Sequence, residues 1–421
     1  MPLPLDVRTA TDEITAVVRA WVEEHVPAAW RDAARAGGRG ALRAVRSRED
    51  YEAWYPEFAD SGLVVATWPV AYGGLGLSVE QARAAEAVLA PYNLGRLNPL
   101  GLNNTAPALF AHGTEEQRRR FLPPIVRDEE RWCQLFSEPG AGSDLASLAT
   151  RAVRDGDEWL LTGQKVWTTW ADRSDLAICL ARTDPTVPKR RGITYFLVDL
   201  HGPGVTIRPL RHLGGEVDFS EVFLDEVRVP DAWRVGAEGD GWRVAGATLA
   251  GERQMVSGAG SGGVDRIGGA SAHRLVARAR ELDRHADPYL RQRLVALYAE
   301  ERIRDWTNQR VRATVRAGST PGPAVSIGKV HQGSLNQRVQ LLATDLLGVH
   351  AMAWEAGATS TGSEWAASMP YEVRGMLRSR ANTIEGGTTE VNKNVLGEKV
   401  LGLPREPDPW SGVPWEDVPR S

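Results

Sequence analysis

The chain has 421 residues, of which 42% are apolar and 25% charged, and its formal net charge at pH 7 is -4. This length predicts two or three domains with a large buried core, and the composition is that of a globular protein rather than a disordered one. The slight acidity argues against nucleic-acid binding, and the lack of a run of about 20 apolar residues argues against a membrane protein.

The cysteine and histidine patterns argue against a fold held together by disulfides or by a bound metal. Cys133 and Cys179 are the two cysteines, and no His-x-x-x-His pair occurs. We therefore expect no disulfide framework, no metal site and a reducing compartment. The first residues lack the basic and apolar regions of a secretory signal, so we expect a cytoplasmic protein.

Residues 1–130 predict an N-terminal helical domain. Helix starts at 11–13, 78–81 and 114–117 each combine a small polar residue with acidic or amide residues. Ile14, Val17, Val18 and Trp21 then fall at helical spacing after the first start. We expect the third helix to end near Pro123-Pro124, because proline cannot donate a helical hydrogen bond.

Residues 131–240 predict a β domain, because short apolar runs at 176–181, 193–198 and 222–224 alternate with glycine turns. Residues 213–230 are interpreted as a β-hairpin. Residues 241–404 predict a second helical domain, whose last long helix begins near Thr388-Thr389-Glu390 and ends before Gly402-Leu403-Pro404. Residues 405–421 contain four prolines and predict an extended tail. Two sets of residues share helix faces in the second helical domain: Leu290, Leu294, Leu297 and Tyr298, and Val339, Leu342 and Leu346.

The most informative segment is residues 136–144, FSEPGAGSD. Gly140, Ala141 and Gly142 let another molecule approach the main chain closely, and Ser143 adds a hydroxyl. Successive amides in such a turn can cradle an anion, although most glycine-rich turns are only turns. Residues 159–169, WLLTGQKVWTT, follow at short range with a strand-like composition.

Together these two segments resemble the acyl-CoA dehydrogenase family, and the resemblance extends along nearly the whole chain to Pro404. It implies an α+β, mainly α fold with an N-terminal helical domain, a middle β domain and a C-terminal helical bundle. It also implies an FAD cofactor, α,β-dehydrogenation of an acyl-CoA thioester, and an electron-transfer flavoprotein as acceptor. The residues that it places at the cofactor are Phe136, Ser137, Gly142, Ser143, Trp167 and Thr169.

Residues 379–390 resemble the family's C-terminal motif, which implies cofactor contacts at Gly386 and Thr388. Many members carry the catalytic glutamate at the position of Gly386, whereas Glu385 here lies one residue earlier. A second group of members places the base before an arginine on an earlier helix. Glu252, followed by Arg253, matches that site, so we predict Glu252 as the base and leave Glu385 as the alternative.

Two features depart from the family and keep other functions open. The Arg-x-x-Phe-Gly segment is missing, and the Gln-x-x-Gly-Gly segment appears only as DLLGV at 345–349. Such losses occur in relatives that pair two unlike subunits, so homo- and hetero-oligomers are both open. The alternatives are a catalytically weak partner subunit and a flavin monooxygenase on the same fold.

The glycine-rich segment 257–263 contains a formal Gly-x-Gly-x-x-Gly, but no clear strand precedes it, so it does not predict a dinucleotide site. We interpret it as a broken helix near the active site that makes room for a bulky acyl group.

Overall fold

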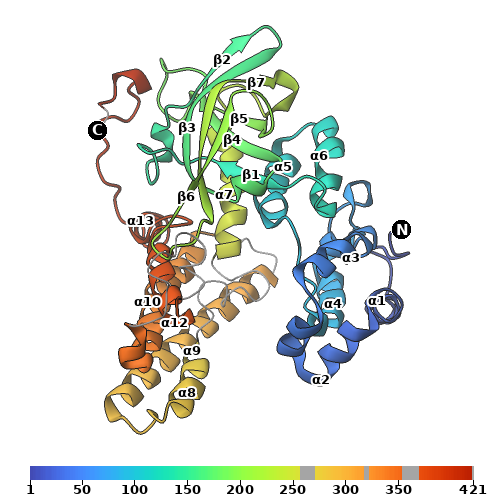
Figure 1. Cartoon of the computed structure of the whole chain (residues 1–421). Helices are drawn as coiled ribbons and strands as arrows, with labels where there is room; N and C mark the ends of the chain where they lie inside the picture. Colours follow the sequence, from blue (N-terminus) through green and yellow to red (C-terminus); the bar gives the residue numbers. More distant parts are fainter. Residues whose placement is uncertain (257–270, 317–321, 353–368, 420–421) are drawn as a thin grey trace.

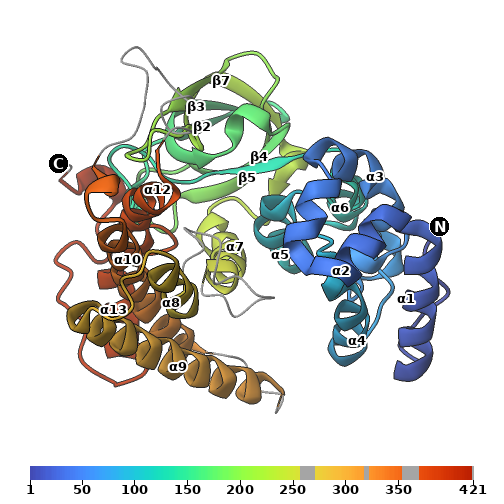
Figure 2. The same ribbon diagram turned by 60° about the horizontal axis from the view of Figure 1, so that its bottom comes forward.

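The computed structural model describes residues 1–256, 271–316, 322–352 and 369–419, without the side chains at 38–40, 250–256, 312, 315 and 316. N-terminal helices, a β domain and C-terminal helices follow one another along the chain (Figure 1). Helix α7 (Gly241–Val256) lies between the two helical parts (Figure 2). This arrangement confirms the predicted mainly α, α+β fold.

Two of the N-terminal helices begin at their predicted capping residues, and the first begins at Thr11 as predicted. Ser78 and Gln81 form a reciprocal capping box at the start of one helix, and Thr114 and Gln117 form another. Ile14, Val18 and Trp21 are buried in the first helix, as predicted from their spacing, whereas Val17 is half-buried. These helices are α1 (Thr11–His25), α2 (Ala28–Val45), α3 (Arg48–Asp60), α4 (Val79–Leu89), α5 (Ala106–His112) and α6 (Glu115–Arg127).

The predicted end of α6 at its proline pair is wrong, because the helix continues to Arg127 with Pro123 and Pro124 inside it. Ile125 and Val126 are both buried and extend the apolar face of the helix past the prolines. Their burial outweighs the backbone hydrogen bonds that two prolines cannot donate.

The strands form one sheet in the order β6-β7-β3-β2-β4-β5-β8, with β1 parallel beside β4. Every residue of β4 is buried, which fits its place inside the sheet. The predicted apolar runs at 176–181, 193–198 and 222–224 all lie in strands. The strands are β1 (Trp132–Leu135), β2 (Arg151–Asp155), β3 (Glu158–Thr169), β4 (Leu176–Arg182), β5 (Ile193–Asp199), β6 (Val205–Leu210), β7 (Phe219–Pro230) and β8 (Arg234–Val235).

The interpretation of residues 213–230 as a hairpin is wrong. Only β7 is a strand within this segment, and it pairs with β6 on one side and β3 on the other. The preceding loop turns at Gly215, whose φ of 84° is in the region that favours glycine.

The C-terminal helices surround α10, which contacts α8, α9, α12 and α13. The predicted inward face of α9 is correct at Leu290, Leu294 and Leu297, but Tyr298 is exposed. Tyr298 lies eight residues after Leu290, which turns it about 80° around the helix. Val339, Leu342 and Leu346 of α10 are buried as predicted. The helices are α8 (Ala272–Glu281), α9 (Pro288–Arg316), α10 (Ser326–Leu347), α12 (Tyr371–Arg378) and α13 (Thr389–Lys399).

The tail beyond Pro404 is not extended throughout. It forms the short 3-10 helix η12 (Trp415–Asp417), and the Trp415 side chain is buried. The prediction followed the prolines and took no account of the apolar surface that Trp415 buries. Among the described residues, no helix has the length and apolar character needed to cross a bilayer.

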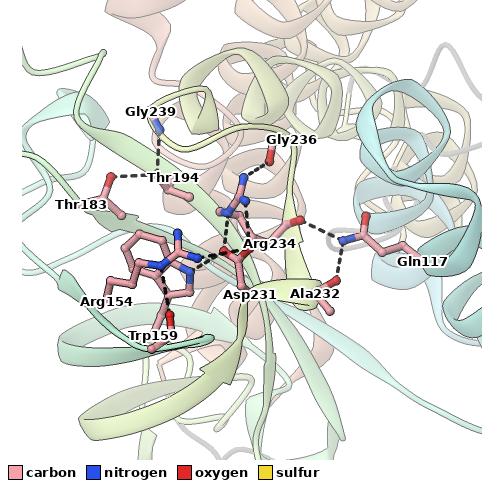
Figure 3. A network of polar contacts seen from close by, with 11 residues as sticks. Gln117, Arg154, Trp159, Thr183, Thr194, Asp231, Ala232, Arg234, Gly236 and Gly239 are labelled. Carbon is pink, nitrogen blue, oxygen red and sulfur yellow. Dashed lines mark hydrogen bonds and ion pairs between the residues drawn. The ribbon is translucent and has the colours of Figure 1, made fainter.

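A polar network joins the edge of the β domain to α6 (Figure 3). Asp231 Oδ1 accepts hydrogen bonds from Trp159 Nε1 and Arg234 Nε, both at 2.8 Å. Gln117 of α6 donates to the carbonyls of Ala232 and Arg234 at 2.8 and 2.9 Å. The short β8 segment that leads toward α7 is therefore fixed from both sides.

Helix α7 is held at its start and along its length. The Gly239 N–H, just before the helix, donates to Thr194 Oγ1 at 2.9 Å (Figure 3). Thr248 Oγ1 donates to the Asn104 carbonyl at 3.1 Å and lies 2.9 Å from the Tyr195 hydroxyl. These bonds tie α7 to β5 and to the N-terminal helices, so the register of the helix is set by both.

We expect the stability of Asp231→Asn to fall less than that of wild type as the pH is lowered. The hydrogen bond from Arg234, opposed by burial and aided by Trp159, holds the pKa of Asp231 at about 2. Because the folded pKa is below the ordinary value of about 4, the carboxylate stabilises the fold above pH 4, and this contribution is lost as pH falls toward 2. Thermal unfolding followed by circular dichroism at pH 7, 4 and 3 measures the difference; equal pH dependence in the two proteins would contradict it.

Candidate active site

The segment 136–144 begins directly after β1 and forms a tight two-residue turn. Glu138 and Ala141 exchange two backbone hydrogen bonds, both of 3.0 Å, which leaves Pro139 and Gly140 at the tip. A Cβ added at Gly140 or Gly142 would meet nothing within 4 Å. The main chain of this turn is thus open to a ligand, as the sequence predicts.

A buried ion pair lies beneath the turn. Lys165 of β3 has an exposed fraction of 0%, and its Nζ lies 2.8 Å from Glu138 Oε1. The same Nζ donates to the carbonyls of Phe136 and Leu180 at 3.1 and 2.7 Å. Lys165 therefore uses all three of its protons inside the protein and joins the turn to β3 and β4.

The Glu138 carboxylate is equally saturated. Oε2 accepts from the Ala149 N–H at 2.6 Å, and Oε1 accepts from the Thr150 N–H at 2.9 Å. Burial opposes ionisation of Glu138, but the charge of Lys165 and these hydrogen bonds outweigh it and lower the pKa of the carboxyl. The pair is held charged, and it fixes both ends of the segment between Glu138 and Thr150.

Two residues after Lys165, the same strand presents Trp167 outward. The Val166 N–H donates to the Ser137 carbonyl at 2.9 Å, so the two motifs predicted to act together lie side by side. Trp167 has a φ of 61° and falls at a register shift between β3 and β7. This bulge leaves 56% of the Trp167 residue exposed, with its ring 5.7 Å from that of Phe219.

The other cofactor residues predicted from the sequence differ in exposure. Ser143 and Gly142 are exposed, and Thr169 is half-buried at the end of β3. The Phe136 side chain is buried and contacts Tyr195, with ring centroids 6.0 Å apart. Phe136 thus supports the turn from below, and its carbonyl binds Lys165.

The predicted C-terminal motif forms a loop between the 3-10 helix η11 (Ser379–Thr383) and α13. Gly386 and Gly387 have φ values of 61° and 85°, so side chains other than hydrogen would be strained at both positions. Thr388 caps α13 by accepting from the Val391 N–H at 3.1 Å. The loop is therefore a tight reversal that exposes Gly387 immediately before a helix.

Glu385 is engaged on both oxygens. Oε2 lies 3.0 Å from Arg378 Nη2, and Oε1 accepts from Asn382 Nδ2 at 3.1 Å. The Arg378 guanidinium carbon also lies 5.7 Å from the centre of the Phe219 ring, beside Trp167. Arg378, which the sequence analysis did not single out, thus links the C-terminal loop to Phe219 of β7, whose ring contacts Trp167.

Glu252 lies in α7, but its side chain is outside the described part of the structure, as is the glycine-rich segment 257–263. The backbone of α7 is fixed at Thr248, one helical turn before Glu252. The predicted role of Glu252 therefore stays a prediction.

A group of His212, Glu216 and Asp218 beside the Trp167 strand was also missed by the sequence analysis. Their potential ligand atoms lie within 4.8 Å of one another. His212 Nδ1 accepts from the Gly214 N–H at 3.0 Å, so Nε2 carries the proton of the neutral ring and faces Asp218 Oδ2 at 3.4 Å. This arrangement satisfies the group by internal hydrogen bonds, and Glu216 pairs in turn with Arg374 of α12 at 3.4 Å.

We expect Glu138→Gln to lower stability by about 3–5 kcal/mol, because it leaves the Lys165 charge buried without its counter-ion. The matched control, Arg228→Gln, breaks an exposed pair with Glu158 in the same domain and should leave the unfolding midpoint almost unchanged. Denaturant unfolding of both variants measures the contrast. Equal shifts of the unfolding midpoint in the two variants would show that the buried pair stabilises the fold no more than the exposed pair does.

Comparison with known proteins gives matches to all three parts of the chain up to residue 401. Models of the acyl-CoA dehydrogenase N-terminal, middle and C-terminal domains match residues 8–129, 133–227 and 239–401. Acyl-CoA dehydrogenase IpdE1 of Mycobacterium tuberculosis is 38% identical over 402 residues, 94% of this chain and 98% of that protein. Acyl-CoA dehydrogenase FadE34 of the same organism is 40% identical over 82% of this chain and 45% of its own length.

Solved structures give the same assignment. The Tcur3481-Tcur3483 steroid ACAD is 28% identical with a TM-score of 0.71, covering 96% of this chain and 100% of that one. A chain of the ChsE4-ChsE5 complex from Mycobacterium tuberculosis is 27% identical with a TM-score of 0.68, covering 94% of this chain and 98% of that one. The chain therefore belongs to the acyl-CoA dehydrogenase family of flavin-dependent oxidoreductases.

Proposed function

We propose that this protein catalyses the FAD-dependent α,β-dehydrogenation of an acyl-CoA thioester. The observation that carries the proposal is the face made by the open turn at Gly140 and Gly142 and the exposed ring of Trp167. The buried pair of Glu138 and Lys165 holds the two parts of this face together.

The residues of this face fit an FAD cofactor. An exposed indole beside a half-buried threonine suits a flat aromatic ring system, and an open glycine turn suits a diphosphate. Ser137, Trp167 and Thr169 would hold the flavin ring, and Gly142 and Ser143 would contact the cofactor or CoA. Gly386 and Thr388 would approach from the C-terminal loop. When bound, FAD supplies the acceptor for the hydride that leaves the β-carbon.

The chain itself must supply a base for the α-proton and donors for the thioester carbonyl. We assign the base to Glu252, because Glu385 is already bound to Arg378 and Asn382. When the base removes the α-proton, the electron pair of the α-C–H bond forms the new double bond as the hydride leaves the β-carbon. The backbone near Gly386 would donate to the thioester oxygen and stabilise the charge that develops there.

For the acyl group we propose a bulky, polycyclic carboxylic acid joined to CoA. Support comes from the structural relative described as a steroid ACAD, which is 28% identical over almost the whole chain. The glycine-rich break predicted after α7 agrees with a wide acyl site. We further propose an electron-transfer flavoprotein as the electron acceptor, as the family resemblance implies.

The second candidate is a subunit of a hetero-oligomer that depends on its partner for flavin binding. Two of the similar solved structures each carry the names of two different proteins, Tcur3481-Tcur3483 and ChsE4-ChsE5. Arg284, near the position of the missing Arg-x-x-Phe-Gly segment, donates to the carbonyls of Asp345 and Leu346 at 2.7 and 3.2 Å. Its guanidinium thus closes the end of α10 within the chain.

The proposal predicts that the FAD-loaded protein loses its visible flavin absorbance anaerobically when a polycyclic acyl-CoA is added. Glu252→Gln should slow this reduction by at least about 100-fold, the usual contribution of a positioned base. Glu385→Gln is the matched control and should keep reduction within a few-fold of wild type if the protein stays folded.

Other outcomes separate the alternatives. A protein that stays colourless after FAD is supplied would favour the partner-dependent subunit. Flavin that no acyl-CoA reduces, but that reoxidises rapidly with oxygen after chemical reduction, would favour the monooxygenase. Turnover confined to short linear acyl-CoAs would contradict the bulky substrate, and a fast Glu252→Gln variant would contradict the assigned base.

A further inference from the structure

The C-terminal tail lies outside the matched family domains, which end at residue 401. It leaves α13 and returns to the β domain, where it ends beside the sheet (Figure 1). Residues 402–411 are exposed, and the contacts of this first part of the tail include an ion pair of 2.9 Å between Arg405 and Glu398 of α13. The second part, which begins at Pro414, binds to the β domain.

Docking occurs on the loop between β4 and β5. The Trp415 N–H donates to the Val187 carbonyl at 2.9 Å, and the Glu416 N–H donates to the Pro185 carbonyl at 3.1 Å. Pro414 forms a bridge with Pro188. The Trp415 residue is 8% exposed, so its indole is covered by the middle domain.

Trp415 covers a buried arginine. The Arg182 guanidinium carbon lies 4.2 Å from the centre of the Trp415 ring, and Arg182 is 3% exposed. A guanidinium that stacks on an indole away from water is a favourable cation–π pair. The indole Nε1 also donates to the Ser147 carbonyl at 3.4 Å.

Arg182 in turn holds the segment that follows the glycine-rich turn. Its Nη2 donates to the Ala146 carbonyl at 2.7 Å and its Nε to the Leu148 carbonyl at 3.1 Å. Its Nη1 donates to the Lys189 carbonyl at 3.0 Å, while the Lys189 ammonium lies 2.6 Å from Asp144 Oδ2. Arg182, which the tail covers, therefore holds Ala146 and Leu148, while Lys189 holds Asp144 beside Ser143.

We propose that the C-terminal tail is a strap in which Trp415, acting through Arg182, positions residues 142–148 for a diphosphate-bearing adenine nucleotide. This inference rests on the proposed function, because that segment carries Gly142 and Ser143. FAD and CoA share the adenosine and diphosphate groups, so either is a candidate ligand. Trp415 is a positioning residue and does not touch the reacting atoms.

The first test needs no ligand. Hydrogen exchange should be faster at the amides of Ser147 and Leu148 in Trp415→Ala than in wild type, with the amides inside β4 and β5 unchanged. Trp410→Ala is the matched control, because Trp410 lies in the same tail but is 43% exposed. Removal of residues 405–421 should reproduce the Trp415→Ala result. Equal exchange in Trp415→Ala and wild type would overturn the strap.

The second test measures ligand binding by titrating FAD into the apoprotein and, separately, a non-reducible acyl-CoA analogue into the FAD-loaded protein. We expect Trp415→Ala to raise one of these dissociation constants about tenfold, a change of the size that a lost cation–π contact produces. The ligand that is affected identifies the occupant. Trp415→Phe keeps an aromatic face over Arg182 and should restore the affinity, and Trp410→Ala should bind as wild type does.

The two tests fail separately. Faster exchange with both affinities unchanged would overturn the positioning role, although the tail is docked. A wild-type protein that binds neither FAD nor acyl-CoA would refute the proposed function, while the exchange experiment would still decide whether the strap exists.

Discussion

The ion pair between Glu138 and Lys165 is the interaction on which the candidate site depends. Lys165 brings together the turn after β1, its own strand and β4, while Glu138 anchors the amides of Ala149 and Thr150. Apolar residues of similar volume often stabilise a fold as well as a buried ion pair does. We infer that this pair contributes mainly to orientation, because it fixes the directions in which the open turn and the exposed indole of Trp167 point.

Three further sets of contacts join other parts of the chain to the β domain. Arg378 connects the C-terminal loop to Phe219 of β7, and α7 is bonded to both β5 and the N-terminal helices. The tail reaches the far end of the turn through Trp415. Segments more than 200 residues apart in sequence, such as Ser147 and Trp415, therefore meet at one site.

Local signals in the sequence predicted much of the fold. Capping boxes at Ser78 and Thr114 need only four neighbouring residues, and apolar runs define buried strands such as β4. The failures involve tertiary contacts. The prolines of α6 were outweighed by burial of Ile125, and the tail was bent by a tryptophan that finds its partner at Arg182. The Glu138–Lys165 pair left one signal, a lysine within an apolar strand, but its partner lies 27 residues away.

The most direct test is a titration of FAD into the Lys165→Met variant, at a temperature where circular dichroism shows both it and wild type to be folded. If the ion pair directs the cofactor face, FAD binds wild type and its dissociation constant rises at least about tenfold in the variant, a loss of about 1.4 kcal/mol or more. An affinity equal to that of wild type, in a folded variant without the Lys165 ammonium, would contradict the central role of the pair.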